Sequence, residues 1–183
     1  IEEGYSFDAA PKLNKERVAI IGGGPAGLSA AYQLRKMGYA STVFEERKEL
    51  GGMMRYGIPG YRTPRDLLDK EIERIINLGD IEVVTGKRVG KDLPLDDIEK
   101  SHDAVLWTIG CWNGKAIPVE GGDATNCITG VDFLEAFCDG RLKVGSKKVI
   151  CVGGGDTSID VVSVARRLGH ISKMNEQDTP ENI

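Results

Sequence analysis

The sequence has 183 residues, a formal net charge of −4 and a pI of about 5.3. This length suits one α/β domain, or one domain and part of another, and the acidic balance recommends neither nucleic acid nor an anionic membrane as a partner. No apolar run approaches the roughly 18 residues of a membrane-spanning helix, and residues 1–16 have the polar composition of a linker or surface arm.

The stretch from residue 17 to residue 45 carries the strongest pattern in the chain. The apolar run at residues 18–21 predicts a buried parallel strand, and a G-x-G-x-x-G motif follows it at once. In such a motif Gly22 allows a tight turn, Gly24 lets a pyrophosphate approach the backbone, and Gly27 lets the next helix lie close to the strand.

The residues after this motif complete a dinucleotide-binding unit. Apolar residues at helical spacing continue to Met37, and Gly38 is expected to end the helix. The next strand, residues 42–44, leads to Glu45, an acid placed to accept hydrogen bonds from ribose hydroxyls. Pro25 suits the first helical turn, where the positive end of the helix would hold a phosphate. The predicted ligand is an adenine dinucleotide.

Residues 46–60 hold four glycines and a proline, which predicts a loop without helix or strand. A binding loop and a plain surface loop remain equally open from spacing alone. Alternating strands and helices follow, and they predict a doubly wound parallel sheet. The expected elements are a helix over 64–78, a strand over 81–85, a short helix near 95–98, a buried strand over 103–109 and a helix over 131–137.

Residues 147–169 repeat the plan of the first unit about 130 residues later. A strand is expected at residues 149–152, then glycines including Gly153 and Gly155, then a helix over 157–168. Ser158 occupies the last motif position, where a small residue still permits close packing of helix on strand. The repetition predicts a second nucleotide site.

The cysteines are four in number and widely spaced, with no C-x-x-C pair. This spacing argues against a zinc or iron–sulfur site within these residues and fits a reducing cytoplasm. We expect the cysteines to be small buried residues with no redox role. The two histidines, His102 and His170, are expected at the surface.

The two glycine motifs, together with GGMMRYGIPGYR at 51–62, DAVLWTIG at 103–110 and DFLEAF at 132–137, resemble the small (β) subunit of NADPH-dependent glutamate synthase and its relatives. These are FAD-containing pyridine-nucleotide oxidoreductases. The resemblance implies FAD at the first motif and NADPH, or NADH, at the second. The FAD contacts that it implies are Gly22, Gly24, Pro25, Ala26, Gly27, Glu45, Gly52, Met53, Arg55, Ile58, Val89, Thr108, Ile109 and Gly110, and those for the nicotinamide cofactor are Gly153, Gly155, Asp156, Thr157 and Ser158.

The resemblance also implies an electron path. Hydride would pass from nicotinamide to flavin with the protein supplying orientation, so no catalytic acid, base or nucleophile is assigned. Gly51 to Met54 offers no cysteine pair beside the flavin, so the acceptor is expected to be an iron–sulfur domain or subunit, such as a glutamate synthase large subunit or ferredoxin. Two alternatives stay open: a non-catalytic FAD-binding assembly subunit, and an NAD(P)H:ferredoxin-type reductase.

The expected architecture is Rossmann-like: an incomplete FAD-binding domain over residues 17–140 and the start of an NAD(P)-binding domain over residues 141–183. The strand that should follow Gly169 and read the adenosine ribose is not recognisable in the polar residues 170–183. The chain is therefore expected to be a fragment of a longer polypeptide that binds the nicotinamide cofactor poorly on its own.

Overall fold

A computed structural model describes residue 8, residues 13–145 and residues 148–170. The chain divides into two compact units. The first unit comprises Ile1–Met54 and Asp66–Gly110, and the second comprises Arg55–Arg65 and Cys111–Ile183. The contact-defined division therefore falls at residue 110, and it assigns the short segment 55–65 to the second unit.

The first unit is built on a four-stranded parallel sheet with strand order β3-β2-β1-β4. Apolar and β-branched residues form the two central strands, which suits strands that are covered on both faces. The strands are β1 (Arg17–Ile21), β2 (Ala40–Phe44), β3 (Ile81–Val84) and β4 (Ala104–Trp107), and the helices between them are α1 (Pro25–Lys36), α3 (Arg65–Ile76) and α4 (Leu95–Ser101).

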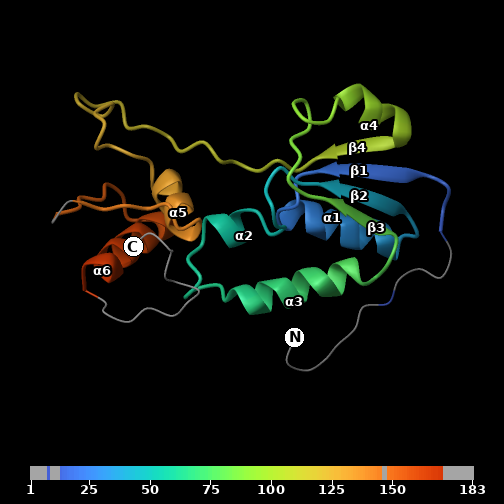
Figure 1. Ribbon diagram of the computed structural model, residues 1–183, viewed down its shortest axis with the longest axis horizontal. Coiled ribbons are helices and arrows are strands. Elements are labelled where there is room, and N and C mark those ends of the chain that lie inside the picture. Colours follow the sequence, from blue (N-terminus) through green and yellow to red (C-terminus); the bar gives the residue numbers. More distant parts are fainter. Residues whose placement is uncertain (1–7, 9–12, 146–147, 171–183) are drawn as a thin grey trace. The chain divides into compact units, whose positions relative to one another are not determined.

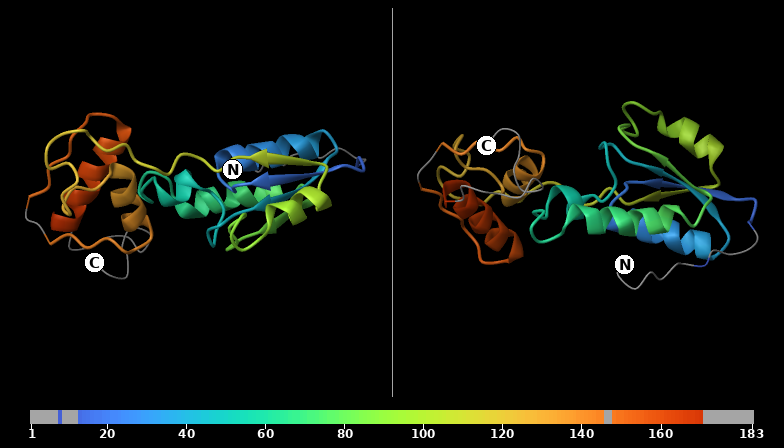
Figure 2. Two further views of the ribbon diagram at one scale, coloured as in Figure 1. Left: turned by 90° about the horizontal axis from the view of Figure 1, so that it is seen from above. Right: turned by 60° about the horizontal axis from the view of Figure 1, so that its bottom comes forward.

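Helices cover both faces of this sheet. Ile20 of β1 and Val43 of β2 share one buried cluster with Leu28 of α1 and with the apolar face of α3. The alternate side chains of β1 and β2 form a second cluster with Ile98 of α4. In the left view of Figure 2, α1 and α4 lie on opposite sides of the strands. The doubly wound α/β prediction is confirmed.

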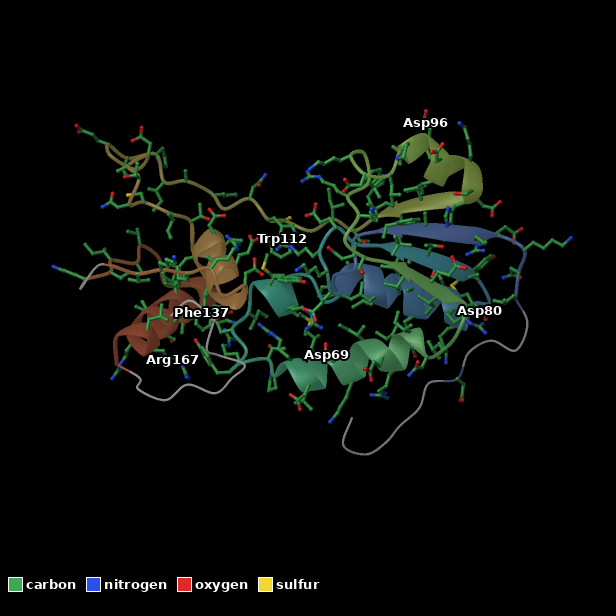
Figure 3. The ribbon with its side chains drawn as sticks, in the orientation of Figure 1. Asp69, Asp80, Asp96, Trp112, Phe137 and Arg167 are labelled. Atoms are coloured by element: carbon green, nitrogen blue, oxygen red, sulfur yellow. The ribbon has the colours of Figure 1, made fainter. Side chains whose placement is uncertain are left out.

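The second unit contains α5 (Gly130–Cys138) and α6 (Asp156–His170), which lie side by side in Figure 1. Their facing apolar residues form a third buried cluster, in which Val164 is fully buried and Phe137 is 2% exposed. Figure 3 labels Phe137 on α5. Tyr61, from the segment 55–65, packs against the same cluster.

Two predicted strands differ from the structure. Residues 149–152 form no strand, and Ile150 and Val152 are 78% and 72% exposed. A strand needs a neighbour for its backbone hydrogen bonds, and none pairs with this run among the described residues. The strand expected at residues 103–109 is present as β4, but it is not buried: Trp107 is 52% exposed, and among the described residues β4 lies at the sheet edge, paired with β1.

Three local predictions also need correction. Within the glycine-rich loop, Met53–Tyr56 forms a short helix, α2, and both Arg55 and Tyr56 are buried. His102 is half-buried rather than at the surface. Its Nε2 atom lies 3.1 Å from the Thr42 hydroxyl and its ring packs edge-on against Phe44. The cysteines are less buried than expected, since two of them are exposed and two are half-buried.

Candidate functional site

The first glycine motif forms the turn from β1 into α1. Gly22 has φ +113°, a conformation that side chains disfavour, and a Cβ there would collide with the Thr108 carbonyl oxygen. A Cβ on Gly27 would collide with the Gly22 carbonyl oxygen. The Thr108 hydroxyl lies 3.0 and 2.9 Å from the carbonyl oxygens of Ile21 and Gly22 and shares its one hydrogen between these two acceptors. These glycines are thus required by the packing of the protein itself.

Gly24 differs from Gly22 and Gly27 because no contact among the described residues requires a glycine there. Its φ of −79° is open to any residue, and an added Cβ would make only an ordinary contact, 3.6 Å from the Gly52 Cα. Within the part of the chain that the structure describes, no side chain caps the N-terminus of α1, where Pro25 and Ala26 are exposed. A helix N-terminus without a side-chain cap, beside a glycine that the packing does not require, has the geometry of a phosphate-binding site.

Glu45 lies at the end of β2 and is 7% exposed. Its Oε2 atom accepts a hydrogen bond from the Gly23 amide at 2.7 Å, and Oε1 accepts one from the Arg47 amide at 2.8 Å. The carboxylate therefore braces the glycine turn. Each of its oxygens has further acceptor capacity, which could serve ribose hydroxyls.

The glycine-rich loop begins beside the first motif. Gly52 has φ +51°, and a Cβ on it would lie 2.7 Å from the Gly24 Cα, so a glycine is needed there. The Gly51 amide donates to the Gly23 carbonyl at 2.8 Å. The chain then forms α2 with Met53 half-buried, and it continues to Ile58 in the second unit.

The other residues predicted to contact FAD follow β3 and β4 in the first unit. Val89 is half-buried in the connection from β3 to α4 and packs against the α4 side of the sheet. Ile109 is 60% exposed, and Gly110 has φ +73°. Both follow the edge strand β4, directly after Thr108. The structure thus brings Gly22, Gly27 and Thr108 into contact, whereas Val89 belongs to a separate connection.

The second glycine motif precedes α6. Gly153 has φ +129° and faces the Ser158 side chain, whose Oγ would lie 2.7 Å from an added Cβ. Gly155, like Gly24, is not required by the packing of the described residues: no described atom lies within 4 Å of an added Cβ on Gly155. Asp156 and Thr157 begin the helix and are exposed. This end of α6 has the outline of a second anion cradle.

Two contacts in the second unit were missed by the sequence analysis. The Arg62 Nη1 atom lies 2.7 Å from Oδ2 of Asp160, a residue of α6 that is only 4% exposed. The Arg167 guanidinium, labelled in Figure 3, lies over the Tyr61 ring at 3.6 Å from its centre. The sequence held one signal for the ion pair: Asp160 directly precedes Val161 on the apolar side of the predicted helix, and a carboxylate that is buried requires a partner.

Burial and charge shift two pKa values around this pair. The hydrogen bond to Asp160, with its charge, raises the pKa of Arg62 above the usual value, and the charge of Asp156 adds to this. Burial raises the pKa of Tyr61, and the Asp160 carboxylate raises it further. Both groups therefore stay protonated at neutral pH.

All four cysteines, each within the described residues, are free thiols. Burial raises the pKa of Cys138 to about 11, which keeps this thiol protonated and unreactive at neutral pH. Among the described residues, no three His, Cys, Asp or Glu side chains gather as metal ligands. None of the helices described is long and apolar enough to cross a membrane.

Comparisons with known proteins identify relatives of this sequence. The chain is 43% identical over 164 residues to the NADPH-Fe(3+) oxidoreductase subunit beta of Geobacter sulfurreducens. The aligned region covers 87% of this chain but only 24% of that protein. It is 33% identical over 181 residues to a putative glutamate synthase [NADPH] small chain of Cereibacter sphaeroides, covering 93% of this chain and 44% of that protein. The chain thus spans less than half the length of these relatives.

A solved structure shares the fold. FprA from Mycobacterium tuberculosis in complex with NADPH superposes with a TM-score of 0.73 at 20% identity, over 82% of this chain and 36% of that one. Residues 16–178 match the family described as pyridine nucleotide-disulphide oxidoreductase, which binds FAD and NAD(P)H. Since this match takes in most of the sequence, the chain belongs to the pyridine nucleotide-disulphide oxidoreductase family.

Proposed function

We propose that this chain holds FAD at the first glycine motif and NAD(P)H at the second. On this proposal it forms the flavin-containing part of an oxidoreductase that passes electrons from NAD(P)H to an iron–sulfur or protein acceptor. The observation that carries the proposal is Gly24, a glycine that neither the backbone conformation nor the packing of the protein requires. A bound pyrophosphate supplies the missing reason, because a Cβ would occupy its place.

The residues of the first motif would each hold a different part of FAD. The backbone of Gly24, Ala26 and Gly27, at the uncapped start of α1, binds the pyrophosphate, and Glu45 accepts from the ribose. The later residues, Gly52, Met53, Arg55 and Ile58, hold the middle and the flavin end. FAD, when bound, can accept a hydride from a nicotinamide ring. The protein orients the two rings, and no acid, base or nucleophile is assigned.

The electron acceptor is proposed to be another domain or subunit. The relatives above are named as a beta subunit and a small chain, which supports a protein that works beside further polypeptides. An iron–sulfur domain, a glutamate synthase large subunit or ferredoxin would each suit one-electron transfer from a reduced flavin. The four free thiols favour a reducing, cytoplasmic location.

A crossed pair of substitutions tests the assignment of the two motifs. Gly24→Ala and Gly155→Ala are both compatible with the protein's own packing, so both variants should fold. We expect Gly24→Ala to weaken FAD binding by about tenfold or more, since a methyl group would meet the pyrophosphate. Gly155→Ala should retain FAD but require more NADPH for anaerobic reduction of the flavin.

The readouts are flavin absorbance per protein, far-UV circular dichroism and an anaerobic NADPH titration. Full FAD retention by a folded Gly24→Ala variant would remove the basis of the proposal. Loss of FAD from Gly155→Ala would show that the two motifs do not have separate ligands.

A further inference from the structure

The segment 55–65 holds residues of two kinds within the second unit. Arg55 and Ile58 are among the residues proposed to hold the middle and the flavin end of FAD, whereas Tyr61, Arg62 and Arg65 contact α5 and α6. The second glycine motif directly precedes α6. One compact unit therefore contains both the proposed flavin-end residues and the start of the proposed nicotinamide site.

The ion pair between Arg62 and Asp160 joins these two parts. The distance from Nη1 to Oδ2 is 2.7 Å, and the Asp160 side chain is 6% exposed whereas that of Arg62 is 46% exposed. The second carboxylate oxygen, Oδ1, is buried without a hydrogen-bond partner among the described residues. The Asp160 carboxylate is thus held through Oδ2, and a charge-assisted hydrogen bond of this kind is stronger than one between neutral groups.

Asp160 is close to the motif along the helix. It lies four residues after Asp156, the first residue of α6, which corresponds to about 6 Å of helix rise. A shift of the Arg62 contact would therefore be transmitted to the N-terminus of α6 through little more than one rigid turn.

Hydrogen bonds within the segment 55–65 hold Arg62 in place. The amides of Arg62 and Thr63 donate to the Pro59 carbonyl at 2.9 and 3.1 Å, which forms a tight turn. Arg65 donates from Nη2 to the Ile58 carbonyl at 2.7 Å. The backbone of Ile58, a proposed flavin contact, is thereby fixed within the same turn that presents Arg62 to α6.

We propose that Arg62 and Asp160 are positioning residues that set the flavin-end residues against the second glycine motif, and so set the approach of nicotinamide to flavin, without touching either cofactor. This inference rests on the proposed function above. It predicts an effect on the rate of hydride transfer rather than on the binding of either cofactor, because small displacements of reacting groups cost rate steeply.

The test uses the full-length, FAD-loaded protein in anaerobic stopped-flow reduction by NADPH. We expect Arg62→Gln and Asp160→Asn each to lower the limiting rate of flavin reduction about tenfold. FAD content and the apparent Kd for NADPH should change by less than about twofold, which is the pattern of lost transition-state geometry. The double variant should be no slower than either single variant, because both remove one interaction. Arg62→Lys should recover part of the rate.

Arg141→Gln is the matched control. Arg141 is an exposed arginine of the same unit that pairs with Asp139 at 2.9 Å, at the opposite end of α5 from its N-cap. It should reduce at the parent rate. An unchanged rate per bound flavin in Arg62→Gln, or additive losses in the double variant, would overturn the positioning role alone. Failure of NADPH and NADH to reduce the parent protein would overturn the proposed function, and this inference with it.

Discussion

At the scale of single residues, the motif glycines separate into those that the packing of the described residues requires and those that it does not. Gly22, Gly27 and Gly52 each face backbone atoms that a Cβ would meet too closely, whereas Gly24 and Gly155 do not. Counting glycines in a motif cannot make this distinction. The space around each Cα makes this distinction, because it shows whether contacts within the folded chain exclude a Cβ at that position.

The packing role of Gly27 leads to a stability prediction. Gly27→Ala places a methyl group against the Gly22 carbonyl oxygen, which is backbone and cannot rotate away. We expect the free energy of unfolding to fall by about 1–3 kcal/mol, as for other overpacked sites, despite the better helix propensity of alanine. Urea denaturation measures the change.

Gly154→Ala is the comparison for this experiment. Gly154 has no described atom within 4 Å of an added Cβ, so its free energy of unfolding should stay close to that of the parent. Equal stabilities of the two variants would contradict the steric role of Gly27.

At the scale of elements, a side-chain cap sets the start of one helix, and the lack of a neighbour among the described residues leaves one predicted strand unformed. The α5 helix starts at a capped position, since the Thr129 hydroxyl accepts a hydrogen bond from the Asp132 amide at 3.2 Å. The apolar run at 149–152 has as strong a strand pattern as β1 but forms no strand. Periodicity reports the propensity of a segment, whereas a strand also requires a neighbour.

The cap of α5 can be tested directly. Thr129→Ala removes the acceptor for the Asp132 amide, and we expect it to lower the free energy of unfolding by about 1 kcal/mol. Thr129→Ser keeps the hydroxyl and should retain most of the stability. The measurement is chemical denaturation of the parent and both variants. A serine variant as unstable as the alanine variant would assign the effect to the lost methyl group instead.

At the scale of the whole molecule, the chain passes between its two units at residues 54–55, 65–66 and 110–111. The third passage leads into residues 111–129, which contain no helix or strand and are largely exposed. The segment 55–65, by contrast, runs from the second half of α2, which includes the buried Arg55, to the first residue of α3.

Limited proteolysis should distinguish residues 111–129 from the segment 55–65 by how soon each is cleaved. We expect brief trypsin treatment to cleave after the exposed Lys115 well before it cleaves after Arg55, because proteases need an extended and accessible backbone. Mass spectrometry of the fragments over time measures the order. Early cleavage after Arg55 would show that the helix α2 opens readily.

Most of the first unit could be predicted from the sequence, because each strand of a doubly wound sheet is followed by a turn signal and an amphipathic helix. The strands, the turn at Gly22 and the helix that ends before Gly38 follow that pattern. The pairing of Arg62 with Asp160, the burial of Arg55 and the contact of His102 with Thr42 could not be predicted. Each depends on residues far apart in the chain, which local periodicity does not record. The ligand contacts remain predictions.

The central place of β1 has a consequence for the order in which the protein is made. This strand pairs with β2, which follows closely, and with β4, whose first residue is Ala104. During synthesis from the N-terminus, one edge of β1 therefore stays open until about 83 residues (104 − 21) have been added beyond it, and a parallel pairing across such a span closes slowly. We expect nascent chains that end before β4 to expose the apolar residues 18–21 as an unpaired edge, which makes them substrates for chaperones.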